Sequence, residues 1–338
     1  MCVAPAGPWG MMPSVDRTAI TSELVSRLVG AQFPRWAGLP VRRVEPGGWD
    51  NITFRLGPDM SVRLPSGPGY AEQVEKEHRW LPGFAGQLPL PIPVPVAMGA
   101  PGCGYPWPWS VYRWLPGEPA ATARPADRAA FAADLAGFLA ALYRIDTAGG
   151  PPPGEHSCFR GAPLTVWDAQ VRRALKALDG EIDTVRAAQV WAEALAAPWH
   201  GPPVWVHGDV ADGNLLVNRA RLSAVIDFGC SAVGDPACDT VIAWTFLSGE
   251  GRRVFQSRLP VDRGTWARGR GWAMWKAMIV LVDALREDPA DALATKHVIA
   301  EVLAGDAWPS GIRPRCRSLC RSRIQCDAAR PARAAITR

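Results

Sequence analysis

The 338-residue sequence lacks several features that define common classes of protein. It contains no run of eighteen apolar residues, so a membrane-spanning helix is not expected. Its first residues, MCVAPAGPWGMM, lack the basic stretch and apolar core of a signal peptide, which favours a cytoplasmic protein without membrane contacts. Neither a Walker A pattern nor a Rossmann glycine fingerprint after a strand occurs, which argues against the two commonest nucleotide-binding loops.

The cysteines form no recognisable metal-binding pattern, and lysine is scarce. None of the eight cysteines belongs to a CxxC pair, and no histidine lies at zinc-finger spacing, so reduced thiols are expected. Only four lysines occur, at positions 76, 176, 276 and 296, so arginine carries most of the positive charge. Eight arginines and one aspartate in residues 313–338 give this segment a charge of +7, which leaves −2 for the rest of the chain.

Strand-like and helix-like patterns divide the chain near Pro116. Before it, residues 16–32 have the apolar spacing of a helix, and so does YAEQVEKEHRWL. Strands are expected at VRRVEPGG, NITFRLG, MSVRLP and WSVYRWL, and the proline-rich LPLPIPVPVAMG is restricted to extended or edge-strand structure. After Pro116, helices are expected at residues 126–146, 165–178, 183–196, 238–247, 265–285 and 291–303, with short strands at VWVHGD, NLLVN and LSAVIDFG.

These patterns predict four parts: a flexible N-terminus (1–15), a first lobe (16–115), a second lobe (116–306) and a tail (307–338). The tail has no apolar periodicity and is expected to be disordered. Its arginines are open to interpretation as a nucleic-acid-binding arm, but its cysteines and lack of lysine favour an unrelated extension, so no nucleic-acid partner is expected.

One segment carries the residues needed for phosphoryl transfer: VWVHGDVADGNLLVNRARLSAVIDFGCSAVGDP. Asp209 ends the first strand, Asn214 follows five residues later, and Asp227 begins an Asp-Phe-Gly triplet after another strand. Such chemistry needs an aspartate beside the attacking hydroxyl and two oxygen ligands for magnesium. We expect Asp209 to be the catalytic base and Asn214 and Asp227 to hold Mg²⁺, at the ends of two adjacent short strands.

The ordered set resembles the aminoglycoside phosphotransferase family. The protein-kinase signature has the same Asp–Asn spacing before its Asp-Phe-Gly, but here Gly208 replaces the usual arginine, and Gly-Asp-Pro follows instead of Ala-Pro-Glu. The resemblance implies an α+β, two-lobed protein-kinase-like fold, with a small antiparallel-sheet N-terminal lobe and a larger, mainly helical C-terminal lobe. It covers about residues 16–306.

Simpler interpretations exist for each acidic residue. Asp209 and Asp227 also suit turns or helix caps, where aspartate is common. His207 is interpreted as structural, as are Asp235 and Asp239, which are expected to anchor the catalytic loop and start a helix.

The resemblance places the nucleotide site in the first lobe. Gly47, Gly48 and Asn51 lie between two strands, where the family has its phosphate-covering turn. No lysine occurs in the following strand, so Arg63 is expected in its place, with Glu77 favoured over Glu75 as its partner.

The strand before Pro116 matches the segment that joins the two lobes. The backbone of Val111, Tyr112 and Arg113 would then meet the adenine. Five of the sixteen tryptophans are candidates for a substrate pocket, although packing is the commoner role: Trp107, Trp109, Trp244, Trp272 and Trp275.

Taken together, these residues and the family resemblance favour an ATP- and Mg²⁺-dependent kinase of a hydroxyl group on a small molecule, such as an aminoglycoside or another antibiotic. A metabolic alcohol of the homoserine, choline or sugar type is an alternative acceptor. A nucleotide-binding pseudokinase would explain Arg63, but would leave Asp209, Asn214 and Asp227 unexplained. The mildly acidic body favours a cationic substrate.

Overall fold

The computed structural model describes residues 16–45, 47–48, 50–123, 125–287 and 289–305. Its first part is an antiparallel five-stranded sheet with the order β1-β2-β3-β5-β4. The strands are β1 (Val41–Arg43), β2 (Asn51–Leu56), β3 (Met60–Pro65), β4 (Pro95–Gly99) and β5 (Trp109–Arg113). The proline-rich segment forms the edge strand β4, as predicted, because an edge strand needs hydrogen-bond donors on one side only.

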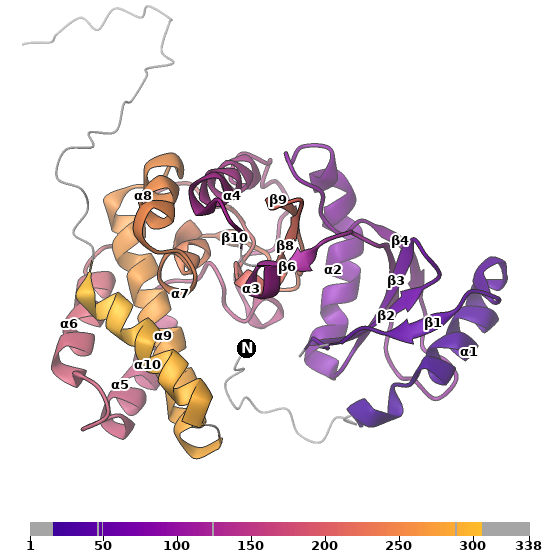
Figure 1. The fold of residues 1–338 in the computed structure, drawn as a ribbon, viewed down its shortest axis with the longest axis horizontal. Helices are drawn as coiled ribbons and strands as arrows, with labels where there is room; N and C mark the ends of the chain where they lie inside the picture. The colour runs from indigo at the N-terminus through magenta and orange to yellow at the C-terminus, as the bar shows by residue number, and fades with distance from the viewer. Residues whose placement is uncertain (1–15, 46, 49, 124, 288, 306–338) are drawn as a thin grey trace, which may run out of the picture. The chain divides into compact units, whose positions relative to one another are not determined.

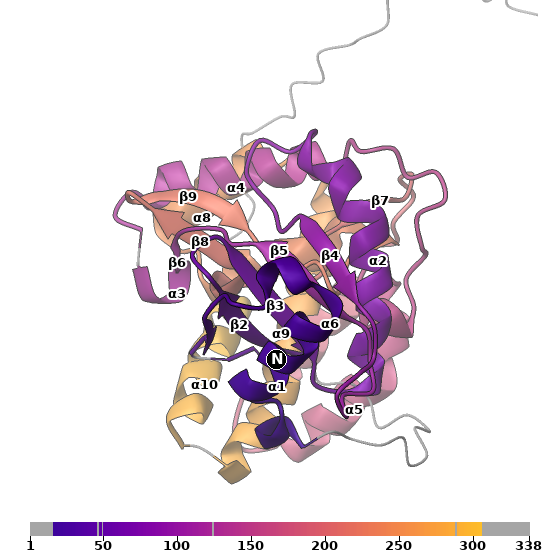
Figure 2. The same ribbon diagram turned by 90° about the vertical axis from the view of Figure 1, so that its right-hand side faces the viewer.

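Two helices cover the two faces of this sheet: α1 (Ser22–Gln32) and α2 (Pro68–Ala85) (Figures 1 and 2). Successive side chains of β3 alternate between them. Val62 and Leu64 join the apolar core formed with α1, whereas Arg63 points to the other face and reaches α2. The predicted helix at 16–32 begins later, because the side chain of Thr21 caps α1 and a separate 3₁₀ turn, Arg17–Ala19, precedes it.

The second part is mainly helical and is built around the long helix α9 (Arg263–Glu287), which contacts α5, α6 and α10 (Figure 1). A helix at residues 249–258 was not predicted. The expected helix at 238–247 is instead a 3₁₀ turn, η6 (Pro236–Thr240), followed by a short α-helix. The α-helices of this part, besides α9, are α3 (Ala120–Ala123), α4 (Arg128–Leu142), α5 (Asp168–Ala177), α6 (Thr184–Leu195), α7 (Ile242–Thr245), α8 (Gly249–Arg258) and α10 (Pro289–Ala304).

Short strands lie among these helices and carry the Asp209–Asp227 segment. β6 (Glu118–Pro119), β8 (Leu215–Asn218) and β9 (Arg221–Val225) form one small sheet, and β7 (Val204–Val206) pairs with β10 (Ala232–Gly234) in another. The prediction that Asp209, Asn214 and Asp227 end adjacent strands is therefore wrong. Asp209 follows β7, which does not pair with β8 or β9, and Asn214 precedes β8.

Contacts group the chain up to Gly305 into one unit, separate from residues 306–338. The predicted flexible N-terminus and disordered tail lie outside the described residues, and the lobe boundary at Pro116 stays a prediction. No described helix has both the length and the apolar character needed to cross a membrane. None of the described cysteines, at positions 103, 158, 230 and 238, forms a disulfide bond.

Candidate active site

A buried carboxylate, that of Asp239, anchors the loop that carries Asp209 through hydrogen bonds to its backbone. Asp239 accepts hydrogen bonds from the backbone N–H groups of His207 (3.0 Å) and Gly208 (2.7 Å). Gly208 has φ +83°, and a Cβ there would lie 2.4 Å from the carbonyl oxygen of Cys230. No side chain fits at this point, which is why glycine stands where protein kinases have arginine.

His207 connects this loop to the segment before Asp227. Its Nδ1 accepts from the backbone N–H of Asp209 at 3.2 Å, so Nε2 carries the proton and donates to the carbonyl oxygen of Ile226 at 3.0 Å. The N–H of Ile226 in turn donates to the carbonyl oxygen of Asn214 at 2.9 Å. Two hydrogen bonds of one buried imidazole and one backbone–backbone bond thus keep the three predicted site residues together. His207 has the structural contacts expected of it.

Asn214 lies in the 3₁₀ turn η5 (Asp212–Asn214) and is oriented by Asp209. Its amide nitrogen donates to the backbone carbonyl oxygen of Asp209 at 3.0 Å and to Oδ2 of the same residue at 3.3 Å. Because both hydrogen bonds use the nitrogen, the amide oxygen is left for another ligand.

Asp227 has an unusual backbone conformation and forms an ion pair with a cation far from it in sequence. Its φ is +69°, a conformation that non-glycine residues rarely adopt and that concentrates at functional sites. Its Oδ1 accepts from Arg63 at 3.0 Å, and the Arg63 guanidinium also lies 3.7 Å from the Glu77 carboxylate. Glu77 is buried and Glu75 exposed, so the structure pairs Arg63 with the glutamate that the sequence favoured.

The electrostatics of this cluster keep Arg63 charged. Burial would lower the pKa of Arg63, but the carboxylates of Asp227 and Glu77 outweigh it and raise the pKa. Burial raises the pKa of Glu77, against the opposing effects of Arg63 and of the Tyr112 hydroxyl, which donates to it. Tyr112 was expected to contribute only its backbone, so this side-chain role was missed.

Lys76 of α2 is largely buried, and sequence reasoning gave it no role in the site. Its ammonium donates to the carbonyl oxygens of Gly229 (2.6 Å), Ser231 (3.1 Å) and His156 (3.0 Å). Burial lowers its pKa. These contacts fix the chain directly after Asp227, so α2 holds the Asp227 segment both through Glu77 and Arg63 and through Lys76.

The remaining nucleotide-side predictions stay predictions. Gly47 and Gly48 lie between β1 and β2, and Asn51 begins β2. Val111 and Tyr112 pair with strands on both sides, whereas Arg113 pairs only with Met60 of β3. The ladder thus leaves the backbone of Arg113 freer for an adenine than that of Val111 or Tyr112.

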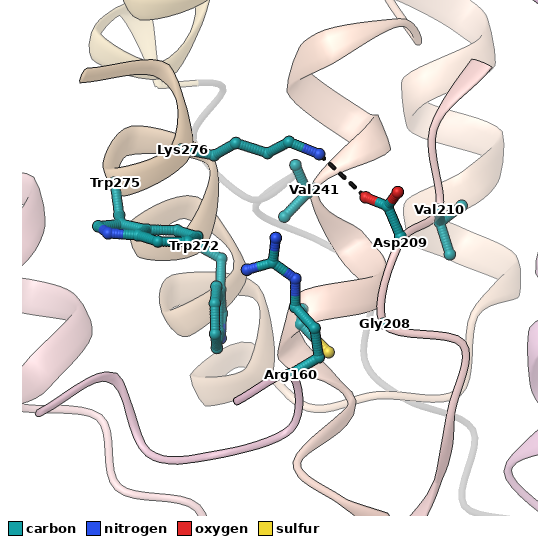
Figure 3. A pocket seen from close by; sticks show the side chains of 9 residues that line it. Arg160, Gly208, Asp209, Val210, Val241, Trp272, Trp275 and Lys276 are labelled. Atoms are coloured by element: carbon teal, nitrogen blue, oxygen red, sulfur yellow. Dashed lines mark hydrogen bonds and ion pairs between the residues drawn. The ribbon is translucent and has the colours of Figure 1, made fainter. Parts of the chain in front are cut away.

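A narrow cavity of about 10 Å³, room for about one water molecule, opens beside Asp209 (Figure 3). The Lys276 ammonium reaches Oδ1 of Asp209 at 3.0 Å from α9, and Arg160 extends into the same space. Burial would raise the pKa of Asp209, but the charges of Lys276 and Arg160 outweigh it and hold the pKa well below its ordinary value. The other lining residues are Gly208, Val210, Cys238, Val241, Trp272 and Trp275.

Both cations were missed, although the sequence contained a signal for one of them. Lys276 is the single charged residue in the apolar stretch 271–282, and a charge in such a helix is usually buried and paired. Of the five candidate tryptophans, Trp272 and Trp275 line the cavity. Trp107 and Trp109 belong to the core of the first part, and Trp244 packs edge-on against Trp266.

Comparison with known proteins agrees with this architecture. Residues 41–272 match the model of the phosphotransferase enzyme family. The chain belongs to this family. A comparison with curated proteins finds no match.

Solved structures of family members share the fold. A GDP complex of a variant of aminoglycoside 2'-phosphotransferase IIIa is 19% identical, with 84% of this chain and 98% of that one covered and a TM-score of 0.67. The macrolide 2'-phosphotransferase MphH from Brachybacterium faecium is 23% identical, with 82% and 100% covered and a TM-score of 0.54. A streptomycin–ATP complex of APH(2")-IIa is 18% identical, with 87% and 98% covered and a TM-score of 0.54. Identities this low establish the kinase-like fold and no more.

The residues of this phosphotransferase fit a magnesium ion. No cluster of three or more histidine, cysteine, aspartate or glutamate side chains occurs in the described part of the chain, so an all-protein metal cage is absent there. Mg²⁺ prefers one or two protein oxygens together with phosphate and water. The amide oxygen of Asn214 and the part-exposed carboxylate of Asp227 provide such a pair.

Proposed function

We propose that this family member transfers the γ-phosphoryl group of ATP to a hydroxyl group of a small molecule. The observation that carries the proposal is the set of contacts that joins Asp209, Asn214 and Asp227 through His207 and Ile226. A turn or cap role would not require the backbone at Asp209, at Asn214 and directly before Asp227 to be connected through one buried imidazole. Both nucleotide and acceptor would bind around this network.

Asp209 would act on the acceptor hydroxyl. Because its pKa is held well below the ordinary value, it is a carboxylate at neutral pH and can accept a hydrogen bond from the hydroxyl. It can then take the proton as the oxygen–phosphorus bond forms. The hydrogen bond from the Asn214 amide to Oδ2 helps to orient the carboxylate.

Arg63, Asn214 and Asp227 would serve the nucleotide. Arg63 can shift from Asp227 toward a phosphate while its charge stays paired with Glu77. Mg²⁺ bound by Asn214 and Asp227 would neutralise charge on the phosphates. Gly47, Gly48 and Asn51 would cover the phosphates, and Arg113, more readily than Val111 or Tyr112, would contact the adenine through its backbone. The ATP named in the streptomycin complex supports this choice of nucleotide.

A phosphate-transfer screen tests the proposal. The purified protein with Mg·ATP would be offered aminoglycosides, macrolides and metabolic alcohols, and mass spectrometry would detect products heavier by one phosphate. We expect at least one product, dependent on Mg²⁺ and absent with Asp209→Asn. Binding of Mg·ATP without transfer to any acceptor would favour a pseudokinase.

A further inference from the structure

Both carboxylate oxygens of Asp209, the proposed base, have a partner in the structure. The Asn214 amide donates to Oδ2 at 3.3 Å, and the Lys276 ammonium lies 3.0 Å from Oδ1 (Figure 3). The Asn214 contact orients the carboxylate and leaves Oδ1 as the oxygen for an acceptor hydroxyl. Lys276 therefore occupies the position on Asp209 that the acceptor needs.

The surroundings of Lys276 favour this ion pair. Lys276 is the single charged residue of the apolar stretch 271–282 in α9, and its side chain is only 23% exposed, as is that of Asp209. Solvent and salt weaken an ion pair of this kind less than one on the open surface. Lys276 and Asp209 come from distant parts of the chain, α9 and the loop after β7, so the contact is a product of the tertiary fold.

The space beside the ion pair has room for water but not for an alcohol. Asp209 and Lys276 both line the cavity of about 10 Å³, which corresponds to about one water molecule. Water is the nucleophile that competes with the acceptor in any phosphoryl transfer. If Asp209 activated water, the water oxygen would bond to the γ-phosphorus and the bond from this phosphorus to the oxygen of ADP would break. The products would be ADP and phosphate, and the proton would pass through Asp209 to solvent.

Displacement of Lys276 discriminates between these two nucleophiles. Moving the ammonium away from Oδ1 breaks a charge-assisted hydrogen bond. An acceptor alcohol has further atoms that bind to the protein, and the binding free energy of such non-reacting parts can offset this loss. A water molecule has no such parts. The ion pair is therefore expected to yield to an alcohol and to persist against water.

We infer that Lys276 determines specificity for the nucleophile, because its ammonium keeps Asp209 from activating water until an acceptor alcohol displaces it. This inference rests on the proposed phosphotransferase function. After displacement, the alcohol oxygen bonds to the γ-phosphorus, ADP leaves with the electrons of the broken bond, and the alcohol proton passes to Asp209 and then to solvent. Lys276 acts through Asp209 and takes no part in these bonds, so it is a positioning residue.

Release of phosphate from Mg·ATP by the full chain, without an acceptor, tests this inference. Lys276→Met removes the charge and keeps an unbranched side chain, so hydrolysis should rise at least about tenfold, a factor that corresponds to about 1.4 kcal/mol. Lys276→Gln should raise it as well, whereas Lys276→Arg retains the charge and should restore most of the suppression. Combining Lys276→Met with Asp209→Asn should return hydrolysis to the level of Asp209→Asn alone.

Lys296→Met is the matched control, because Lys296 forms an exposed ion pair with Glu181 and does not line the cavity. It should hydrolyse ATP at the rate of the unaltered protein. Loss of a purely structural contact would lower hydrolysis and not raise it. Unchanged or lower hydrolysis in both Lys276→Met and Lys276→Gln would therefore overturn the inference, and so would a gain that persists in the combined variant with Asp209→Asn.

Phosphate transfer to an alcohol is scored separately in the acceptor screen. Transfer by the unaltered protein, without a gain of hydrolysis in the Lys276 variants, would remove the inference and keep the proposed function. A gain of hydrolysis without transfer to any acceptor would support the role of Lys276 against water and count against an alcohol as the substrate. With an acceptor from the screen, Lys276→Met should lower the ratio of transferred to released phosphate at least about tenfold, the same change in barrier. An unchanged ratio would overturn the inference.

Discussion

Asp227 and Asp209 each form a 3.0 Å ion pair with a cation from a distant part of the chain, Arg63 and Lys276 respectively. The surroundings of the two pairs are opposite in charge. Arg63 lies between two carboxylates, those of Asp227 and Glu77. Asp209 lies among two cations, because Arg160 lines the same cavity as Lys276. Among these residues, carboxylates therefore outnumber cations around Arg63, whereas cations outnumber carboxylates around Asp209.

The two ion pairs are also expected to respond differently when nucleotide and acceptor bind. Arg63 can leave Asp227 for a phosphate and still neutralise Glu77, so the buried carboxylate keeps a counter-ion throughout. In the proposed reaction Lys276 would leave Asp209 when the acceptor hydroxyl binds to this carboxylate. On the nucleotide side, Arg63 would move from one anion to another while it stays beside Glu77.

The largest effect is expected from Asp227, the proposed metal-binding carboxylate. Asp227→Asn keeps a side chain that tolerates the positive φ but removes the charge, so Mg²⁺ binding should weaken and phosphate transfer should fall below detection. Calorimetry should show that affinity for Mg·ATP falls more than affinity for adenosine. If both affinities fall equally, Asp227 has a structural role and the metal binds elsewhere.

The proposed base should give the next largest effect. Asp209→Asn should lower kcat by at least about a hundredfold, as loss of a general base does, while Mg·ATP binding is retained. Asp179→Asn, an exposed aspartate of the same part of the chain, is the control and should leave kcat unchanged. Full turnover by the Asp209 variant on a confirmed acceptor would contradict the assignment.

Arg63 tests the nucleotide half of the comparison. Arg63→Ala should raise the KM for ATP roughly tenfold or more, because this change corresponds to the free energy of one hydrogen bond to a charged group. It should also lower Tm, because Glu77 is then buried without its cation. Arg63→Lys should restore part of both losses, since it restores the charge but not the planar fork. Unaltered ATP kinetics in Arg63→Ala would mean that another residue holds the phosphates.

The two halves of the site also differed in how well they could be predicted. Asp209, Asn214 and Asp227 share one continuous motif, and Arg63 occupies a known place relative to a strand, so sequence reasoning proposed them. Lys276 and Arg160 come from α9 and from a loop, at no fixed spacing from that motif. Only tertiary packing brings them to Asp209. Lys76 was missed for the same reason, because its three carbonyl partners, at His156, Gly229 and Ser231, lie in segments far from it in the sequence.

The same limit applies to the fold. Apolar runs and proline content predicted four strands and one extended or edge segment of this sheet, whereas the antiparallel sheet itself was implied by the family resemblance. The pairing of β7 with β10 depends on three residues in each strand, too few to show a register. The helix expected at 238–247 is interrupted because Asp235 caps a 3₁₀ turn and Asp239 accepts hydrogen bonds from the loop that carries Asp209.

A double-mutant cycle measures the Lys276–Asp209 pair directly. Lys276→Gln and Asp209→Asn, singly and together, should show a coupling of about 1 kcal/mol or more in urea unfolding, because both side chains are only 23% exposed. The exposed pair Lys296–Glu181 is the reference, where Lys296→Gln and Glu181→Gln should couple by about 0–1 kcal/mol. Equal coupling free energies in the two cycles would mean that partial burial does not strengthen the Lys276–Asp209 ion pair.

The smallest effect is expected from the segment that lies outside both halves of the comparison. Residues 308–338 contain few large apolar side chains, at Trp308, Ile312, Leu319, Ile324 and Ile336, and without regular spacing. Such a segment cannot bury enough surface to offset an ordering entropy of roughly 1–2 kcal/mol per residue. The last described helix, α10, ends at Ala304, and the contacts divide the chain after Gly305.

Truncation after Asp306 should therefore leave Tm unchanged and kcat within about twofold of that of the full chain. It should also improve solubility, because it removes three thiols and a dense cationic run. If the arginines instead bind a polyanion or close over the phosphates, the truncated protein will lose ATP affinity or fail to fold, and calorimetry with Mg·ATP distinguishes the two results.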